Sequence, residues 1–293
     1  TDTEKAAFRS LRTYSGTTNL SITDDPEFTA IYTKNSESGQ TVAEVQTDLQ
    51  EQITKVAAII VGTPEMHRNI FRGKYLGTSV TAAQLAAIAD GTFDDLYTGD
   101  YWVMGGVNWR IADMDYWLGT GDIEMTAHHL LIVPDTGLYT AQMNATNSTS
   151  TGYVNSKMRT ENLTEAKTII NSVFGNMVLT HRDYLSSAVS GGAVQTSVWV
   201  DSTVDLMNEV LVYGRKEFST TSKVFTINKS QLALFQLAPA FITNREASWL
   251  YDVSSATHFT LIGNNGLAAI EPASVSYEVR PVFAIGVADA NNS

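Results

Sequence analysis

The chain has 293 residues, a formal net charge of −12 and no cysteine, and 43% of its residues are hydrophobic. This length allows one large domain or two of ordinary size, with enough apolar residues for a sizeable core. An acidic surface repels phosphate, so no nucleic-acid partner is expected. The lack of cysteine excludes disulfides and thiolate metal sites. The chain has no apolar run long enough to predict a membrane span, and residues 1–20 are too polar for a signal peptide.

Residues 1–40 are polar and predict an extended arm that is ordered only against something else, although a disordered tail is equally compatible. Thr41–Val61 is the clearest predicted helix, and Gly62 and Pro64 end it. Its heptad core positions are Val42, Val45, Leu49, Gln52, Val56 and Ile59. We favour an oligomerising segment over residues 41–65. An amphipathic helix docked on its own domain is the alternative.

Residues 66–77 carry a small basic cluster of Arg68, Arg72 and Lys74 in an otherwise acidic chain. The cluster is either a contact for an acidic partner subunit or ordinary surface charge. The next predicted helix, Thr81–Asp90, begins with Thr81 and Gln84 in the spacing of a capping box and is followed by Gly91.

The main sheet is predicted to begin within Thr92–Val133. Asp100–Val103 and Val107–Ile111 flank Gly105-Gly106 and predict a hairpin, and His128–Val133 predicts another strand. Three tryptophans are expected in or near the core, namely Trp102, Trp109 and Trp117. Thr136–Ser156 is rich in Asn, Thr and Ser and predicts a surface loop.

The following region predicts a helix over Asn162–Phe174, with Asn162 as its N-cap and Gly175 as its stop. Leu179–Val189 is interpreted as a helical turn region that Gly191-Gly192 interrupts. Val210–Tyr213 is a strand candidate, and Ser230–Leu237 predicts a short helix.

The C-terminal region alternates strands and turns. His258–Ile262 has period-two patterning and predicts a half-buried strand, followed by a tight hairpin at Gly263–Gly266. Val279–Ile285 is mostly apolar and predicts a strand buried on both faces, within which Pro281 indicates an edge or a bulge.

Motifs of catalysis are lacking. The chain has no G-x-S-x-G, P-loop, H-E-x-x-H or Rossmann glycine pattern, so we expect no enzyme, cofactor or metal. His128 and His129 are neighbours on a strand and should diverge, which favours structural histidines. A weak calcium alternative uses an acidic set of Asp113, Asp115, Asp122 and Glu124. An enzyme acting on glycan would need two carboxylates across a cleft, and no motif pairs them.

The last sixty residues carry a resemblance. Trp249-Leu250, the hairpin and the closing EVRPVFAIG run (278–286) are similar to the C-terminal end of bacterial and phage C-type-lectin-like domains, and YWVMGGVNWRIADMDY (101–116) resembles their opening hairpin. The fuller pattern resembles phage and prophage head-fibre or tail-associated proteins of Gram-positive bacteria. Its matching stretches are HRNIFRGKYLG (67–77), FDDLYTGDYWV (93–103), HHLLIVPD (128–135), LTHRDYL (179–185) and SQLALFQL (230–237).

This resemblance implies an α+β fold in which residues 66–293 form a C-type-lectin-like head. It further implies a virion protein, made in the host cytoplasm and released on lysis, that joins other virion proteins and recognises a cell-surface protein or glycan. A structural decoration protein of capsid or tail, without a ligand, is the alternative. The implied ligand face is Tyr251–Asn265, with the residues Tyr251, Ser254, Thr257, His258, Thr260, Asn264 and Asn265. The loop around Asn144–Asn155 is a possible addition to that face.

Overall fold

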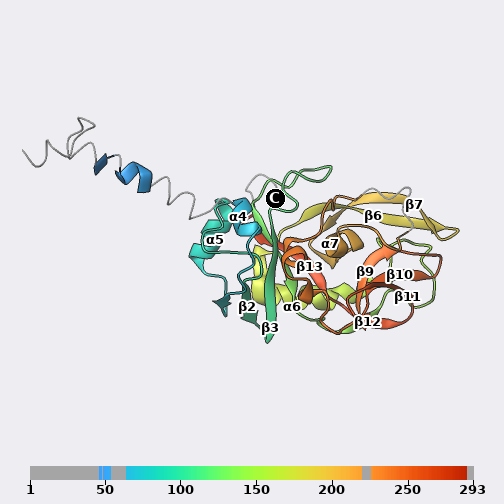
Figure 1. The fold of residues 1–293 in the computed structure, drawn as a ribbon. Helices are drawn as coiled ribbons and strands as arrows, with labels where there is room; N and C mark the ends of the chain where they lie inside the picture. Colours follow the sequence, from blue (N-terminus) through green and yellow to red (C-terminus); the bar gives the residue numbers. More distant parts are fainter. Residues whose placement is uncertain (1–45, 48, 54–63, 220–225, 289–293) are drawn as a thin grey trace, which may run out of the picture. The chain divides into compact units, whose positions relative to one another are not determined.

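The computed structural model describes residues 46–47, 49–53, 64–219 and 226–288 (Figure 1). The chain divides into two compact units, Thr1–Val61 and Gly62–Ser293. In the first unit the described residues are helical, as the heptad pattern predicts, and Leu49 and Ile53 are 56% and 52% exposed. The predicted arm and the heptad positions Val42, Val45, Val56 and Ile59 lie outside the described residues. Among the described helices, none has the length and apolar character that crossing a membrane requires.

The second unit, called the head below, is built on a six-stranded sheet with the strand order β1-β2-β3-β4-β13-β8. The predicted hairpin is confirmed, because β2 and β3 pair antiparallel with Met104 opposite Val107. The strands are β1 (Tyr75–Gly77), β2 (Tyr101–Met104), β3 (Val107–Met114), β4 (His129–Pro134), β13 (Pro281–Gly286) and β8 (Val204–Leu206).

Strand β13 lies inside this sheet, between β4 and β8, and all six of its residues are buried. The predicted strand buried on both faces is therefore confirmed. The expectation of an edge or bulge at Pro281 is wrong, because Pro281 is the first residue of the strand and lies opposite Leu206. A proline at that position interrupts no ladder within the strand.

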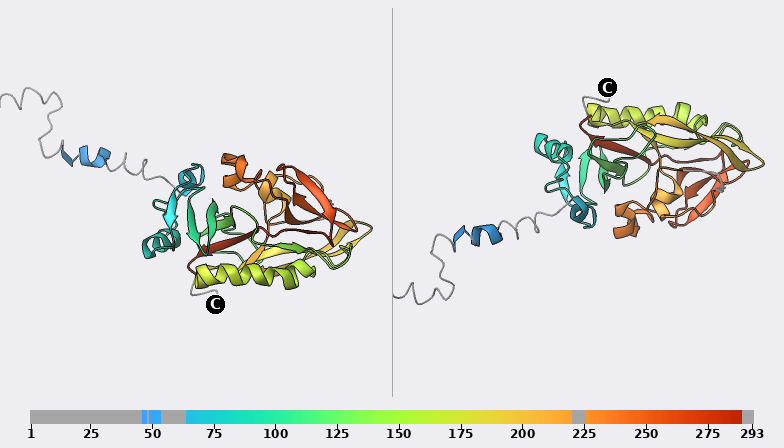
Figure 2. Two further views of the ribbon diagram at one scale, coloured as in Figure 1. Left: turned by 90° about the horizontal axis from the view of Figure 1, so that it is seen from below. Right: turned by 90° about the horizontal axis from the view of Figure 1, so that it is seen from above.

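Each face of the sheet has its own hydrophobic core. On one face Phe283 and Ile285 pack with residues of α6 (Leu163–Phe174), including Ile170. On the other face Val282 and Ala284 pack with residues of α7 (Glu209–Tyr213) and α8 (Ala233–Leu237). The sheet therefore lies between α6 and the α7–α8 pair (Figure 2). Period-two alternation along β13 sends successive apolar side chains into the two cores.

A second sheet has the strand order β11-β10-β9-β12-β5, and all its pairs are antiparallel except β12 with β9. The predicted turn at Gly263–Gly266 is confirmed, since Gly263 N donates to Leu267 O over 2.7 Å and Gly266 has a φ of 78°. The strands are β11 (Ala268–Pro272), β10 (His258–Ile262), β9 (Ser248–Val253), β12 (Ser276–Glu278) and β5 (Thr140–Gln142).

Strands β6 (His181–Ser190) and β7 (Ala193–Ser202) form a two-stranded hairpin that turns at Gly191-Gly192. The expected helical turn region over Leu179–Val189 is therefore wrong. From His181 to Leu185, buried residues alternate with the half-buried Arg182 and Tyr184, as in a strand with one face on the core.

The remaining helices correct one further expectation, confirm one in part and confirm one in full. Val210–Tyr213 belongs to α7 rather than to a strand, because Asn208 caps that helix by accepting from Leu211 N over 2.8 Å. Asn162 stands at the N-cap position of α6 as predicted, but its side chain accepts no capping hydrogen bond, because η2 (Met158–Asn162) leads directly into α6. The capping box of Thr81 and Gln84 is present at the start of α5 (Ala82–Ala89). The other short helices are α4 (Pro64–Arg68), η3 (Gly175–Met177) and η4 (Pro239–Phe241).

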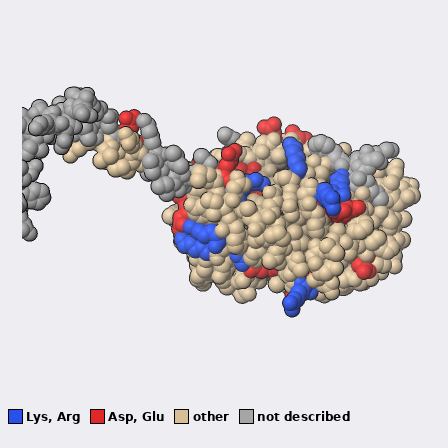
Figure 3. Space-filling view, viewed as in Figure 1, with Lys and Arg blue, Asp and Glu red and all other residues tan. Residues whose placement is uncertain are grey.

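The head is thus of the mixed α+β class, with mainly antiparallel sheets and few helices, as expected for the class. Trp102, Trp109 and Trp117 are buried, as predicted. The predicted surface loop Thr136–Ser156 is only partly one, because it includes β5 and the fully buried Met143 and Tyr153. Charged side chains on the face seen in Figure 3 form small groups separated by wide uncharged areas.

Candidate functional site: converging polar loops

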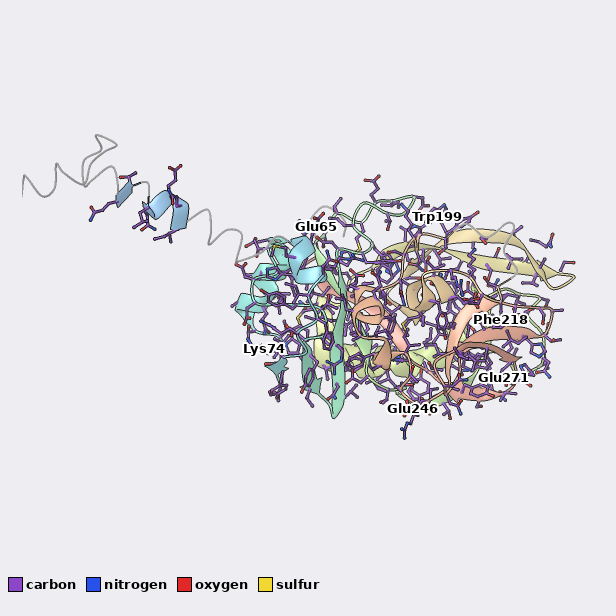
Figure 4. All side chains as sticks on the ribbon, viewed as in Figure 1. Glu65, Lys74, Trp199, Phe218, Glu246 and Glu271 are labelled. Carbon is purple, nitrogen blue, oxygen red and sulfur yellow. The ribbon has the colours of Figure 1, made fainter. Side chains whose placement is uncertain are left out.

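Four connecting segments meet at one end of the head, and we call them the loop cluster: residues 144–152, 190–193, 254–258 and 272–275. They flank β9, β10, β11 and the tip of the β6–β7 hairpin. Figure 4 marks Glu271, next to one of these segments, at the end of the head opposite Lys74. Loops held by a rigid sheet at one end of a domain are a common location for binding residues.

Thr149 joins two of the four segments. It is fully buried, its hydroxyl donates to Ser255 O over 2.6 Å, and its backbone N–H donates to Ala256 O over 3.0 Å. The hydroxyl of Ser274 donates to Asn147 Oδ1 over 2.6 Å, which ties in a third segment. These bonds hold the cluster in one arrangement.

Two glycines allow the hairpin to approach the other segments. A Cβ on Gly152 would lie 2.3 Å from Ser186 O, so only glycine fits where residues 144–152 cross β6. A Cβ on Gly192 would lie 3.2 Å from Ala256 N, which shows how near the hairpin tip comes to residues 254–258. The tip is therefore the fourth member of the cluster.

The outer surface of the cluster is made mainly of small polar side chains, and it includes the exposed apolar residues Ala145, Ala256 and Val275. The exposed polar positions include Asn147 and Ser150. His258 lies at their border, where its Nδ1 is 2.7 Å from Thr257 Oγ1 and 3.2 Å from Ser255 Oγ. Hydroxyl and amide groups of this kind offer hydrogen bonds to a polar ligand at low cost in conformational entropy.

The sequence-predicted ligand residues separate into three groups. Ser254, Thr257 and His258 lie in the cluster and are half-buried. Tyr251 and Thr260 do not lie on a ligand face, because they are 6% and 0% exposed. The Tyr251 ring stacks on Tyr153 with centroids 5.1 Å apart. The expectation of a half-buried β10 is also wrong, since its last four residues are buried.

Asn264 and Asn265 form the third group. Both are exposed, but they lie in the β10–β11 turn, at the other end of β10 from His258. A five-residue strand is roughly 17 Å long at about 3.4 Å per residue. The predicted ligand face is therefore two separate surfaces, of which only the first belongs to the loop cluster.

Three buried aspartates lie on β6, β8 and β9, away from the exposed surface. Asp183, Asp205 and Asp252 are 3%, 4% and 6% exposed. Asp205 accepts from Tyr153 Oη over 2.8 Å and from Ser202 Oγ over 2.6 Å, and Asp252 accepts from Glu209 N over 2.6 Å. Burial raises the pKa values of Asp183 and Asp252 to about 7, helped by Asp205 and Glu209 respectively.

These aspartates are buried supports of the fold rather than a pair across a cleft. Two cavities of about 460 Å³ in the described part of the head have other linings. One is lined by the segment from Ile123 to Ala127, the start of β6, Asp201 and Ala288, and the other by residues of β5, η2 and α6. The geometry that a glycan hydrolase needs is therefore not formed by these three carboxylates.

The two adjacent histidines both make hydrogen bonds. His129 is fully buried, its Nε2 accepts from Trp117 N over 3.1 Å, and burial lowers its pKa. His128 Nδ1 bonds to Asp115 over 2.7 Å. Asp113 pairs with Arg68 and Asp122 with Arg182, so the acidic calcium set is divided among separate partners. In the described part of the chain, no three His, Asp or Glu side chains come together as a metal site would need.

The basic cluster is neutralised within the head. Arg68 pairs with Asp113, while Arg72 bonds to Asp95 and Asp100. Lys74 pairs with Asp95 over 2.6 Å. These contacts favour ordinary, internally paired surface charge over the hypothesis of a contact with an acidic partner.

Comparison with family models, with curated proteins and with solved structures found no match to this chain.

Proposed function

We propose that the protein is a non-enzymatic virion protein, a head fibre or tail-associated fibre of a phage of Gram-positive bacteria. Its head, of the C-type-lectin-like class, recognises a host-surface protein or glycan through the loop cluster. Residues 41–65 join copies of the chain into an oligomer that attaches to other virion proteins. The protein is made in the host cytoplasm and leaves by lysis.

One observation carries this proposal: four segments far apart in the sequence converge on one polar surface. Two internal hydrogen bonds fix the loops, one from Thr149 to Ser255 and one from Ser274 to Asn147. Other hydroxyl and amide groups of the cluster are exposed and can bond to a ligand. A preorganised surface of this kind loses little entropy when it binds. The sequence resemblance supports the virion context, and the loop geometry supports the proposed location of the site.

The test measures binding of the fluorescently labelled full chain to cells of a panel of Gram-positive bacteria. Ala256→Lys places a long charged side chain in the middle of the loop cluster without removing an internal side-chain bond. Leu267→Lys is the matched control, because Leu267 is 66% exposed in the β10–β11 turn. We expect Ala256→Lys to reduce cell binding at least about tenfold, which is about 1.4 kcal/mol, and Leu267→Lys to leave it unchanged.

Equal binding by the wild type and both variants would contradict the loop cluster as the site. Loss of binding in Asn264→Ala or Asn265→Ala, but not in Ala256→Lys, would move the site to the β10–β11 turn. A wild type that binds no cell in the panel, yet remains attached to purified particles, would favour the alternative of a purely structural decoration protein.

A further inference from the structure

An exposed aromatic patch lies at the end of the head opposite the loop cluster. We define it as Phe71, Tyr75, Tyr101 and Phe241, joined through Arg110. Phe71 contacts Phe241 with ring centroids 5.9 Å apart, and Tyr75 contacts Tyr101 at 5.7 Å. The Arg110 guanidinium lies over both inner rings, 4.3 Å from the Phe241 centroid and 4.6 Å from that of Tyr101. The outer rings are the exposed ones, Phe71 by 40% and Tyr75 by 49%.

The fold fixes Phe71 in this exposed position. Its ring lies against Gly99, where a Cβ would come within 2.2 Å of Phe71 Cε2. Gly99 has a φ of 87°, a conformation that favours glycine. A large apolar ring held at the surface by a dedicated glycine resembles the preformed anchors that aromatic residues provide in protein interfaces.

The charges around the patch are already balanced. Arg110 forms a two-point ion pair with Asp135, at 2.6 Å to each carboxylate oxygen. Arg72 and Lys74 are likewise bonded to Asp95, and Arg72 also to Asp100. Two identical surfaces that meet bring like charges together, which costs free energy unless those charges are neutralised. This patch can therefore face a copy of itself.

The position of the aromatic patch in the chain also favours a second copy of the chain as its partner. The patch begins shortly after the helix that exposes Leu49 and Ile53, one turn apart on a single stripe. Where such helices join copies of the chain, the connected heads have an effective concentration of order mM. A contact with a Kd of about 1 mM, about 4 kcal/mol, is then half-formed.

We propose that the aromatic patch is a second self-association surface, through which the heads of neighbouring copies contact one another at their N-terminal end. This inference rests on the oligomer of the proposed function. Contact at this end leaves the loop cluster, at the other end of the head, free for a ligand. It assigns the two ends of the head to two tasks, assembly and recognition.

The chain has no cysteine, so a single introduced thiol reports its own position. In the full chain, Tyr75→Cys and, as control, Leu267→Cys are compared by their rate of maleimide labelling across a range of protein concentrations, with mass measured by light scattering. Because a half-formed contact leaves the thiol exposed half of the time, we expect the thiol at position 75 to label about twofold more slowly where the chain is oligomeric, and the thiol at 267 to label at one rate throughout. Phe71→Ser with Tyr75→Ser is expected to weaken self-association, while Ile123→Ser, at a residue 61% exposed, leaves it unchanged.

Equal labelling at positions 75 and 267 in a chain that is oligomeric by mass would overturn the inference and leave the proposed oligomer intact. A chain that is monomeric at every concentration would overturn both. Protection at 75 that disappears on dilution, together with the reduced self-association of the serine variant, would establish the patch as a contact between copies.

Discussion

Buried carboxylates show how single residues of this head depend on their surroundings. Asp252 lies on β9 and accepts from the backbone N–H of Glu209, the first residue of α7. The carboxyl is buried and lies near Glu209, so the charged form is disfavoured and the pKa of Asp252 rises to about 7. Asp183 on β6 has its pKa raised to about 7 by the same cause. Near neutral pH both carboxyls therefore change protonation inside the core.

This predicts an unusual pH dependence of stability. The unfolded chain has ordinary aspartates with pKa values near 4, so between about pH 4 and 7 the folded state binds more protons than the unfolded state. The free energy of unfolding should then fall as the pH rises through this window. In Asp252→Asn, whose amide oxygen can still accept from Glu209 N, the part of this decrease due to Asp252 should vanish. The variant should gain roughly 3 kcal/mol on the wild type between pH 4 and 8.

Urea unfolding at a series of pH values measures this gain, with Asp94→Asn, at an exposed position, as the matched control. A difference between Asp252→Asn and the wild type that does not change with pH would show that Asp252 is charged in the folded protein.

At this scale the sequence predicted some residues well and others not. The three tryptophans in the core follow from aromatic chemistry alone. The burial of Tyr251 and Thr260 does not, because the period-two pattern identifies two faces of a strand without telling whether both are covered. Here β9 and β10 lie inside their sheet and both faces meet other parts of the head.

Among the elements, α5 is the one whose ends the sequence predicted best. Thr81 Oγ1 accepts from Gln84 N over 3.2 Å, and Gln84 Oε1 accepts from Thr81 N over 2.9 Å. The same Gln84 oxygen accepts from the buried indole N–H of Trp102 over 3.2 Å. The capping box is thus linked to β2, a link that depends on tertiary structure and has no signature in the sequence.

Because Gln84 takes part both in the cap and in the hydrogen bond from Trp102, substituting it should cost more stability than substituting Thr81. Thr81→Ala should lower the free energy of unfolding by about 1 kcal/mol, the usual loss of an N-cap. Gln84→Ala should lower it by roughly 2–3 kcal/mol, because it also leaves the Trp102 N–H buried without an acceptor. Chemical denaturation measures both, with Ser79→Ala as an exposed control outside the helix. Equal losses for the two variants would mean that Gln84 acts only as part of the cap.

The β6–β7 hairpin shows why other elements were missed. The segment from Leu179 to Val189 mixes polar and apolar residues, and Gly191-Gly192 marks a break for a helix and for a hairpin alike. The partner strand lies beyond that break, and its pairing decides the structure. Because the hairpin was not predicted, the approach of its tip to residues 254–258 could not be predicted either. The loop cluster was therefore predicted only in part, through Ser254, Thr257, His258 and the Asn144–Asn155 region.

For the whole molecule, the α+β class that the resemblance implies agrees with the structure, but the division of the strands into a six-stranded sheet, a five-stranded sheet and a hairpin was not predicted. That division depends on non-local pairs such as β13 with β4 and β12 with β5, which bring distant segments together. The same packing separates the polar loop cluster from the aromatic patch. For the proposed fibre, assembly at one end and recognition at the other is the simplest use of these two surfaces.

The helix before the head decides whether that arrangement exists, and its exposed stripe supplies the test. Leu49→Glu with Ile53→Glu places two charges where a heptad core would exclude water. Light scattering should then find the wild type at a multiple of the 31.9 kDa chain mass and the double variant shifted toward one chain. Glu51→Gln, on the same helix, should keep the mass of the wild type. A wild type of one chain mass would instead favour the alternative of a helix docked on its own domain, and any assembly of the heads would then need another protein.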